Sequence, residues 1–313
     1  MTQMTGENNS VGRPVAGETW WGGEVCTSTR GEFVCRQKKI GQEYVLAFPS
    51  LDLIRRNFRL IYGIGAKTEE LLRKSGYQTL ADLTGHPRWG KAAKEVINLI
   101  EERKLDRLRR YGAKDEEILG FFCGEQLVFV DLETTGFSQL QPLFLIGTMS
   151  FAGERLVIKQ YLARDYAEEA AVLAGFLRDC EAKAVMVSFN GRSFDYPYLL
   201  ARLAYHGFTH SFNPFQLDLL PPTRRAFRDT LPDCRLRTVE EQLLGVARHE
   251  TFSGVKIPEL YHRFVTEKNP RLLTEVIEHN ARDLLSMAAL VRLLAEEFWC
   301  RNGAGRSQGQ EDR

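Results

Sequence analysis

The sequence lacks the features that mark membrane proteins, secreted proteins and small zinc-bound domains. No apolar run approaches the roughly 20 residues needed to cross a bilayer, and residues 1–17 have neither an apolar core nor a charged start. The six cysteines include no CxxC pair, which argues against a zinc ribbon, and the absent signal argues against a disulfide framework. Cys26 and Cys35 could face each other across a hairpin, although free thiols are the simpler interpretation. We therefore expect a cytoplasmic protein without membrane contact.

A large excess of charge of either sign is also lacking, but the charges are unevenly distributed. The 313 residues carry a net charge of +1, and their 43% hydrophobic content is ordinary for a globular protein of one large and one smaller domain. Residues 51–110 carry 14 Lys and Arg against 8 Asp and Glu, whereas residues 111–313 carry a net charge of −5. A basic unit that binds a polyanion beside an acidic unit that holds cations fits this division, and so does a solvated basic helical face.

The hydrophobic period changes twice along the chain. Residues 18–48 alternate apolar and polar residues between glycines, which predicts a β-hairpin. The period becomes helical over residues 51–110, so a compact helical module is expected there. Beyond Lys114, the runs LVFVDLE, PLFLIGTMSF and RLVIKQYL predict three adjacent antiparallel strands.

The rest of the chain combines helices with one further strand. A helix over residues 167–180 precedes the apolar strand AVMVSFN, a second helix runs from about residue 193 to 206, and the sequence beyond Leu217 is mostly helical. This order implies an α/β fold over residues 120–299, with a mixed sheet and helices on both faces. Residues 1–17 and 300–313 are expected to form flexible, disordered tails.

Two carboxylates stand at the end of the first of these strands. Asp131 and Glu133 follow the apolar run LVFV and precede TTG. Residues two apart in a strand point to the same face. Two like charges at such a short distance repel each other at a cost in free energy unless a cation neutralises them. Paired hard oxygen donors are what Mg²⁺ or Mn²⁺ prefers. Two incidental acids at a solvated strand end are the alternative.

Two further acids begin helices. Asp195, in FNGRSFD, falls in the first turn of a helix with Ser193 as the expected N-cap, where an acid could merely complement the helix dipole. Asp283, in EHNARD, lies four residues after His279, so both side chains share one helical face. Beside a metal-bound acid, the His279 imidazole could take a proton. A surface histidine beside an ion pair with Arg282 is the alternative.

Together these elements resemble a known group of enzymes. DLETTG, NGRSFD and HNARD, in that order, are similar to the three motifs of the DEDD exonuclease superfamily, the proofreading branch of ribonuclease-H-like proteins. Within it, the YprB-type family is the closer match, on LDLLPPTRRAF, LPDCRLRTVEEQLLG, GVKIPELYHRF and EHNARDLLSMAAL. The resemblance covers about residues 124–297. It implies a ribonuclease-H-like sheet in which the ligands of two Mg²⁺ or Mn²⁺ ions are Asp131, Glu133, Asp195 and Asp283.

The resemblance also implies a reaction. Two cations roughly 4 Å apart would activate a water and stabilise the leaving 3′-oxygen of a phosphodiester, with His279 as candidate base. His-type members place their histidine five residues before the last Asp, and Tyr-type members place their tyrosine four residues before it. Here a histidine stands at the Tyr-type spacing, a departure from both patterns. We expect a 3′–5′ exonuclease on DNA or RNA; the alternative is a catalytically weak nucleic-acid-binding module.

The helical module contains a second motif. In IYGIGAKTEELL, a turn with Gly63 and Gly65 connects two helices, and Lys67 lies beside it. Exposed backbone N–H groups at such a turn bind phosphate without reading bases. The string resembles a helix-hairpin-helix motif, although Tyr62 replaces the usual proline and Glu69 a small residue. An ordinary αα-hairpin with a glycine C-cap is the alternative.

Further residues are expected to bind nucleic acid or to support the acidic residues. Thr134 and Asn190 adjoin the acidic motifs, and Arg224 and Arg225 belong to an arginine-rich segment that could follow a phosphate backbone or form a solvated surface. Asp218 could orient a ligand or cap the helix before Pro221. The choice between DNA and RNA and the oligomeric state stay open.

Overall fold

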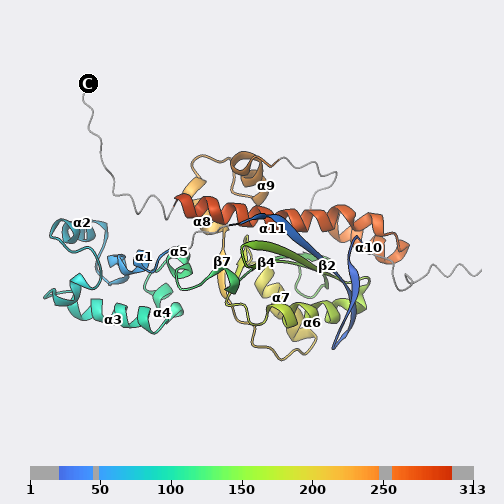
Figure 1. The fold of residues 1–313 in the computed structure, drawn as a ribbon, viewed down its shortest axis with the longest axis horizontal. Helices are drawn as coiled ribbons and strands as arrows, with labels where there is room; N and C mark the ends of the chain where they lie inside the picture. Colours follow the sequence, from blue (N-terminus) through green and yellow to red (C-terminus); the bar gives the residue numbers. More distant parts are fainter. Residues whose placement is uncertain (1–20, 45–48, 247–255, 298–313) are drawn as a thin grey trace, which may run out of the picture.

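The computed structural model describes residues 21–44, 49–246 and 256–297 (Figure 1). The tails expected over residues 1–17 and 300–313 lie outside these residues. Within them, seven strands form one sheet in the order β1-β2-β5-β4-β3-β6-β7. The strands are β1 (Glu24–Ser28), β2 (Gly31–Glu43), β3 (Leu127–Thr134), β4 (Leu143–Ala152), β5 (Arg155–Leu162), β6 (Val185–Ser188) and β7 (Phe215–Asp218).

The sheet is mixed, as the sequence predicts. β3, β4 and β5 are neighbours and antiparallel, which confirms the three adjacent strands expected from the apolar runs. β6 and β7 lie parallel to β3 on its other side. The N-terminal hairpin β1–β2 pairs with β5 and extends this same sheet. The helical pattern of the C-terminal half did not predict β7. This strand has only four residues, too few for a clear pattern, and it pairs with β6 at the edge of the sheet.

Helices cover both faces of the sheet, which confirms the expected α/β fold (Figure 1). α6 (Glu169–Cys180) and α7 (Asp195–Tyr205) lie on one face, and α11 (Thr274–Ala295) runs across the other. The alternation of β3 separates two cores. Val128, Val130 and Leu132 pack in the core that contains residues of α6 and α7, whereas Leu127 and Phe129 pack in the core that contains residues of α11. β3 is therefore apolar on both faces until its acids begin.

The other elements form the helical module and the connections. The module has its own core, in which Ile54, Phe58 and Leu83 are fully buried. Its elements are α1 (Asp52–Arg55), η1 (Phe58–Leu60), α2 (Ala66–Lys74), η2 (Asp82–Gly85), α3 (Gly90–Glu101), α4 (Leu105–Arg110) and α5 (Asp115–Leu119). Connecting elements are η3 (Gly124–Gln126), η4 (Tyr166–Glu168), α8 (Leu220–Phe227), α9 (Leu236–Val239), the π-helix η5 (Glu240–Leu244), α10 (Ile257–Glu267) and η7 (Pro270–Leu273). Among the described helices, none combines the length and apolarity of a membrane span.

A buried ion pair joins the two helices of the α6/α7 face. Arg202 of α7 donates from Nε and Nη2 to the two carboxylate oxygens of Glu169 of α6, at 2.7 and 2.6 Å, and both side chains are almost wholly buried. The backbone N–H of Leu143 also donates to Glu169. Arg202 additionally donates to the carbonyls of Gln139 and Leu140, so the pair holds the β3–β4 loop against α7.

Glu169→Gln should therefore destabilise the fold strongly. The substitution removes the counter-charge of a buried guanidinium, and breaking such a pair typically costs about 3–5 kcal/mol. Urea denaturation measures the change, with an unaltered slope expected. The control is Glu241→Gln, which breaks the exposed pair between Arg237 and Glu241 and should cost less than about 1 kcal/mol. Equal losses in the two variants would contradict the assignment.

Candidate active site

The first two acids project from the end of β3. Asp131 is partly exposed and Glu133 is 8% exposed, and the two side chains alternate with Leu132, which enters the core beneath α7. They therefore point toward the face that α11 covers. In the β3–β4 register, Asp131 lies opposite Gly147. The strand thus presents two carboxylates on one face, as the spacing predicts.

A fully buried amide holds Asp131 in place. Asn280 of α11 donates from Nδ2 to Oδ2 of Asp131 at 2.8 Å and to its backbone carbonyl at 3.1 Å. Gln160 of β5 donates to Oδ1 of the same amide at 2.8 Å, which fixes its orientation. A Cβ on Gly147 would stand 2.1 Å from Oδ1 of Asn280. Glycine at this position in β4 is what lets the α11 amide reach the β3 carboxylate.

The acidic motifs alone did not predict a role in the site for Asn280 or Gly147. Both left a signal: Asn280 stands directly after His279 in the third acidic motif, and Gly147 interrupts an apolar strand, where glycine often marks close approach of another group. Neither signal names the partner, because the contact joins residues 149 positions apart.

Asp195 reaches the end of β3 from the other face of the sheet. Its Oδ1 accepts a hydrogen bond from the backbone N–H of Leu132 at 3.2 Å, and the residue is buried. The expected N-cap, Ser193, is wrong: α7 begins at Asp195 and its N-cap is Phe194. The Ser193 N–H is used within the preceding turn, where it donates to the Asn190 carbonyl. The turn is thus one residue longer than the N-cap preference suggested.

The turn before Asp195 is tightly packed against it. Asn190 adopts a left-handed φ of 64°. A Cβ on the next residue, Gly191, would stand 2.2 Å from the Ser188 hydroxyl oxygen and 3.1 Å from Oδ2 of Asp195. Glycine is therefore required here for close approach, and the conformation of the turn bears directly on the position of the carboxylate.

The fourth acid and the histidine come from α11. The expectation that Asp283 begins a helix is wrong, because α11 starts at Thr274 and Asp283 lies in its interior. Nε2 of His279 lies 3.7 Å from Oδ2 of Asp283, and each side chain is 13% exposed. The two residues share a helical face, as their spacing of four predicts. The imidazole is thus next to the carboxylate of Asp283.

The electrostatics connect the four acids. Burial raises the pKa of Asp131 well above its ordinary value, and the charges of Asp283, Glu133 and Asp195 raise it further, while the Asn280 hydrogen bond lowers it. Burial likewise raises the pKa of Asp195 to about 7, helped by the charges of Asp218 and Asp283 and opposed by backbone hydrogen bonds. Three chain segments therefore bring carboxylates close enough to repel one another.

This repulsion is what a divalent cation would relieve. Carboxylate oxygens are the ligands that Mg²⁺ and Mn²⁺ prefer, so the chemistry of the donor set fits these ions. In the part of the chain that the structure describes, no three histidine, cysteine or acidic side chains are gathered into a group that could hold a metal ion as they stand. The fit rests on the donor types and their mutual repulsion.

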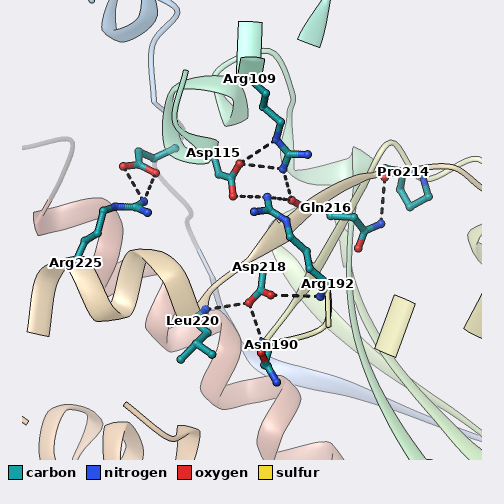
Figure 2. A network of polar contacts seen from close by, with 10 residues as sticks. Arg109, Asp115, Asn190, Arg192, Pro214, Gln216, Asp218, Leu220 and Arg225 are labelled. Carbon is teal, nitrogen blue, oxygen red and sulfur yellow. Dashed lines mark hydrogen bonds and ion pairs between the residues drawn. The ribbon is translucent and has the colours of Figure 1, made fainter. Parts of the chain in front are cut away.

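Asp218 has a clear structural role at the end of β7 (Figure 2). Its Oδ1 accepts from the backbone N–H groups of Asn190, at 2.8 Å, and Leu220, at 3.0 Å, while Oδ2 accepts from that of Arg192 at 3.3 Å. It therefore holds the turn before Asp195 and the start of α8 together. Asp218 thus bonds the first residue of α8, although the N-cap of that helix is Leu219, and the orientation of a ligand by Asp218 stays a prediction.

The residues expected to bind nucleic acid lie in different surroundings. Thr134 is 9% exposed, and its hydroxyl donates to the Gly136 carbonyl. Asn190, Arg224 and Arg225 are all exposed, and Arg225 also donates to both carboxylate oxygens of Glu116 in α5, at 2.8 and 3.2 Å. Arg225 thus joins two helices.

The glycine turn of the helical module connects the three-residue 3-10 helix η1 to α2, whereas the sequence predicted a turn between two helices. Gly63 has a φ of 87°, Gly65 is the N-cap of α2, and Lys67 is exposed in its first turn. A Cβ on Gly63 would approach the Trp89 ring at 3.3 Å, while one on Gly65 would meet nothing within 4 Å. The turn is therefore supported by Trp89 on one side and open at Gly65.

Comparison with known proteins identifies the fold family. Residues 128–295, more than half of the chain, match the family model of the RNase_H superfamily. The chain is 32% identical over 171 residues to the uncharacterized protein YprB of Bacillus subtilis (strain 168). That alignment covers 52% of this chain and 40% of YprB, so the chain spans about two fifths of the length of this relative.

One solved structure with a similar chain path is a family B DNA polymerase from the hyperthermophilic archaeon Pyrobaculum calidifontis. The similarity has a TM-score of 0.40 at 18% identity and covers 55% of this chain and 24% of the polymerase. The family model and the YprB relative confirm the resemblance to the YprB-type ribonuclease-H-like family. The chain belongs to the RNase_H superfamily, as a YprB-type member.

Proposed function

We propose that this protein is a metal-dependent nuclease that acts as a 3′–5′ exonuclease on DNA or RNA. The observation that carries the proposal is the electrostatic crowding of Asp131 by three other carboxylates at one end of an RNase_H-superfamily sheet. A catalytically weak nucleic-acid-binding module has no need to keep four acids facing a polyanion. The repulsion is a cost to the fold that cation binding explains.

The proposed ligands of Mg²⁺ or Mn²⁺ are Asp131, Glu133, Asp195 and Asp283. The bound ions would supply the positive charge that activates the attacking water and stabilises the leaving oxygen. The chain's own contribution is orientation. Asn280 fixes Oδ2 of Asp131, the Leu132 N–H fixes Oδ1 of Asp195, and His279 stands beside Asp283, where Nε2 can accept a proton.

The loop between β3 and β4 offers a platform for bases next to these acids. Phe137 and Leu140 are 83% and 85% exposed, unusual for side chains of this size. Their loop is held from α7: Tyr198 donates to the carbonyls of Gly136, at 3.2 Å, and Gln141, at 2.8 Å. We propose that Phe137 stacks on a base of the substrate strand and that Leu140 contacts it through apolar packing.

The helical module supplies a second proposed contact. The basic surplus of residues 51–110 and the open turn at Gly65 beside Lys67 suit a phosphate of the nucleic-acid backbone. We propose that this turn acts as a helix-hairpin-helix grip. It would bind without sequence preference, since only backbone N–H groups and one lysine take part.

Replacement of Asp131 by asparagine tests the acidic centre. Cleavage of a fluorescent oligonucleotide in Mn²⁺ should fall at least about 100-fold, because a metal-ligating charge is lost. In EDTA, the free energy of unfolding should rise by about 1 kcal/mol, because a repelled carboxylate becomes neutral.

The control for this experiment is Asp229→Asn, which neutralises a side chain that is 89% exposed and should change neither quantity. Full activity in Asp131→Asn, or wild-type cleavage that persists in EDTA, would remove the proposed function.

Phe137→Ala tests the base platform. KM for a single-stranded oligonucleotide should rise about tenfold with little change in kcat, since stacking on one base contributes about 1–3 kcal/mol. Hydrolysis of a p-nitrophenyl ester of a nucleoside monophosphate, which has no neighbouring base, should be unchanged. The idea fails if both substrates are affected alike.

Gly65→Glu combined with Lys67→Glu tests the grip. DNA binding should weaken, and the slope of log K against log salt should flatten by about 1, the effect of one lost phosphate contact. The same charge change on the exposed face of α3, Lys94→Glu with Asn98→Glu, is the matched control and should leave the slope nearer that of the wild type. An unaltered slope in the first variant would count against the grip.

A further inference from the structure

A polar bridge connects the helical module to the turn that precedes Asp195 (Figure 2). Arg109 of α4 donates to Oδ1 of Asp115 in α5, from Nη2 at 2.9 Å and from Nε at 3.2 Å. Arg192, in the turn, donates to the other oxygen of the same carboxylate, Oδ2. Asp115 is thus shared between an arginine of the module and an arginine of the turn.

Both arginines also bind one backbone carbonyl of β7. Nη2 of Arg109 donates to the Gln216 carbonyl at 2.7 Å, and Nη2 of Arg192 does so at 2.5 Å. The Arg109 guanidinium lies 4.1 Å from the centroid of the Phe215 ring. Two guanidinium groups on one carbonyl would repel each other, and the Asp115 carboxylate between them, with 11% of its side chain exposed, compensates that repulsion.

The turn reached by Arg192 is the one packed against Asp195. Asp218 holds its backbone from β7, Gly191 lies against Ser188 and Asp195, and the Tyr196 N–H donates to the Gly191 carbonyl. Asp218 fixes the backbone at Asn190 and Arg192. Of these two residues, Arg192 has the side chain that reaches the helical module. A change at the far end of this side chain therefore acts on the residues that set the Asp195 carboxylate.

We propose that Asp115 is a positioning residue for Asp195, so that the helical module completes the active site. Through Arg192, Asp115 keeps the turn at Gly191 closed and the carboxylate of Asp195 directed at the end of β3. This inference rests on the proposed function, since Asp195 is one of the proposed ligands. The module then has two roles, binding of the nucleic-acid backbone and orientation of a catalytic acid.

The same helix provides a matched control. Glu116, next to Asp115, pairs with Arg225 of α8. That pair also connects the module to the RNase_H-superfamily domain, but it does not involve the turn before Asp195. Asp115→Asn and Glu116→Gln each remove one charge from α5 and one bridge between the same two parts. Docking of the module alone predicts equal effects, whereas positioning of Asp195 predicts an effect of Asp115 that Glu116 lacks.

Hydrogen exchange of the segment 188–196 is the primary test, because it requires neither metal nor activity. In Asp115→Asn the amides of Ser193 and Tyr196 should exchange about tenfold faster, the consequence of losing one charge-assisted hydrogen bond. In Glu116→Gln they should exchange as in the wild type. Arg192→Gln removes the other end of the bridge and should reproduce the Asp115→Asn pattern. Equal exchange in Asp115→Asn and Glu116→Gln would overturn the proposal.

Mn²⁺-dependent cleavage is the second readout. The Mn²⁺ concentration for half-maximal rate should rise about tenfold in Asp115→Asn and stay unchanged in Glu116→Gln, as expected for a residue that orients a ligand. A wild-type half-maximal concentration in Asp115→Asn would overturn the link to Asp195. If the wild type cleaves nothing while the exchange pattern holds, the proposed function fails and the positioning of the turn stands.

Discussion

Mutual repulsion between carboxylates is the constraint on which the site depends. Asp131 is held near three other acids in a partly dry environment, where charges interact much more strongly than in water. The chain offsets part of the cost with neutral donors: the Asn280 amide for Asp131 and the Leu132 N–H for Asp195. Within the described residues, the hydrogen bonds to the carboxylates of Asp131 and Asp195 come from neutral groups. This leaves negative potential available for a cation.

Two loops support these acids, and each loop is held by an arginine that forms an ion pair with an acidic residue. The β3–β4 loop is held by Arg202, whose charge is balanced by Glu169, and the turn before Asp195 is held by Arg192, whose charge is balanced by Asp115. In both cases an arginine donates to backbone carbonyls as well as to its acid. Two ion pairs that lie outside the proposed ligands, Arg202–Glu169 and Arg192–Asp115, therefore help to hold the backbone around the site.

The local features of this site could be predicted from the sequence. Its long-range contacts could not, and the reason is physical. The alternation that places Asp131 and Glu133 together, and the helical spacing of His279 and Asp283, are local properties that a pattern reveals. The Asn280–Asp131 and Arg192–Asp115 contacts join residues 149 and 77 positions apart. Tertiary packing decides such pairs. The sequence therefore shows an unusual glycine in β4, Gly147, but it does not show that the Asn280 amide packs against this glycine. The turn before α7 was likewise mispredicted because its hydrogen bonds override the N-cap preference of Ser193.

The uneven charge of the chain follows from the same constraint. A polyanion is repelled by an acidic centre until cations are bound there, so attraction at a distance has to come from elsewhere on the molecule. Residues 51–110 carry the positive surplus, and the Arg109–Asp115–Arg192 bridge fixes this module against the turn that ends at Asp195. A flexible tether would supply attraction without fixing direction. A rigid connection supplies both, so under the proposed function a strand held by the module would approach the acids along one path.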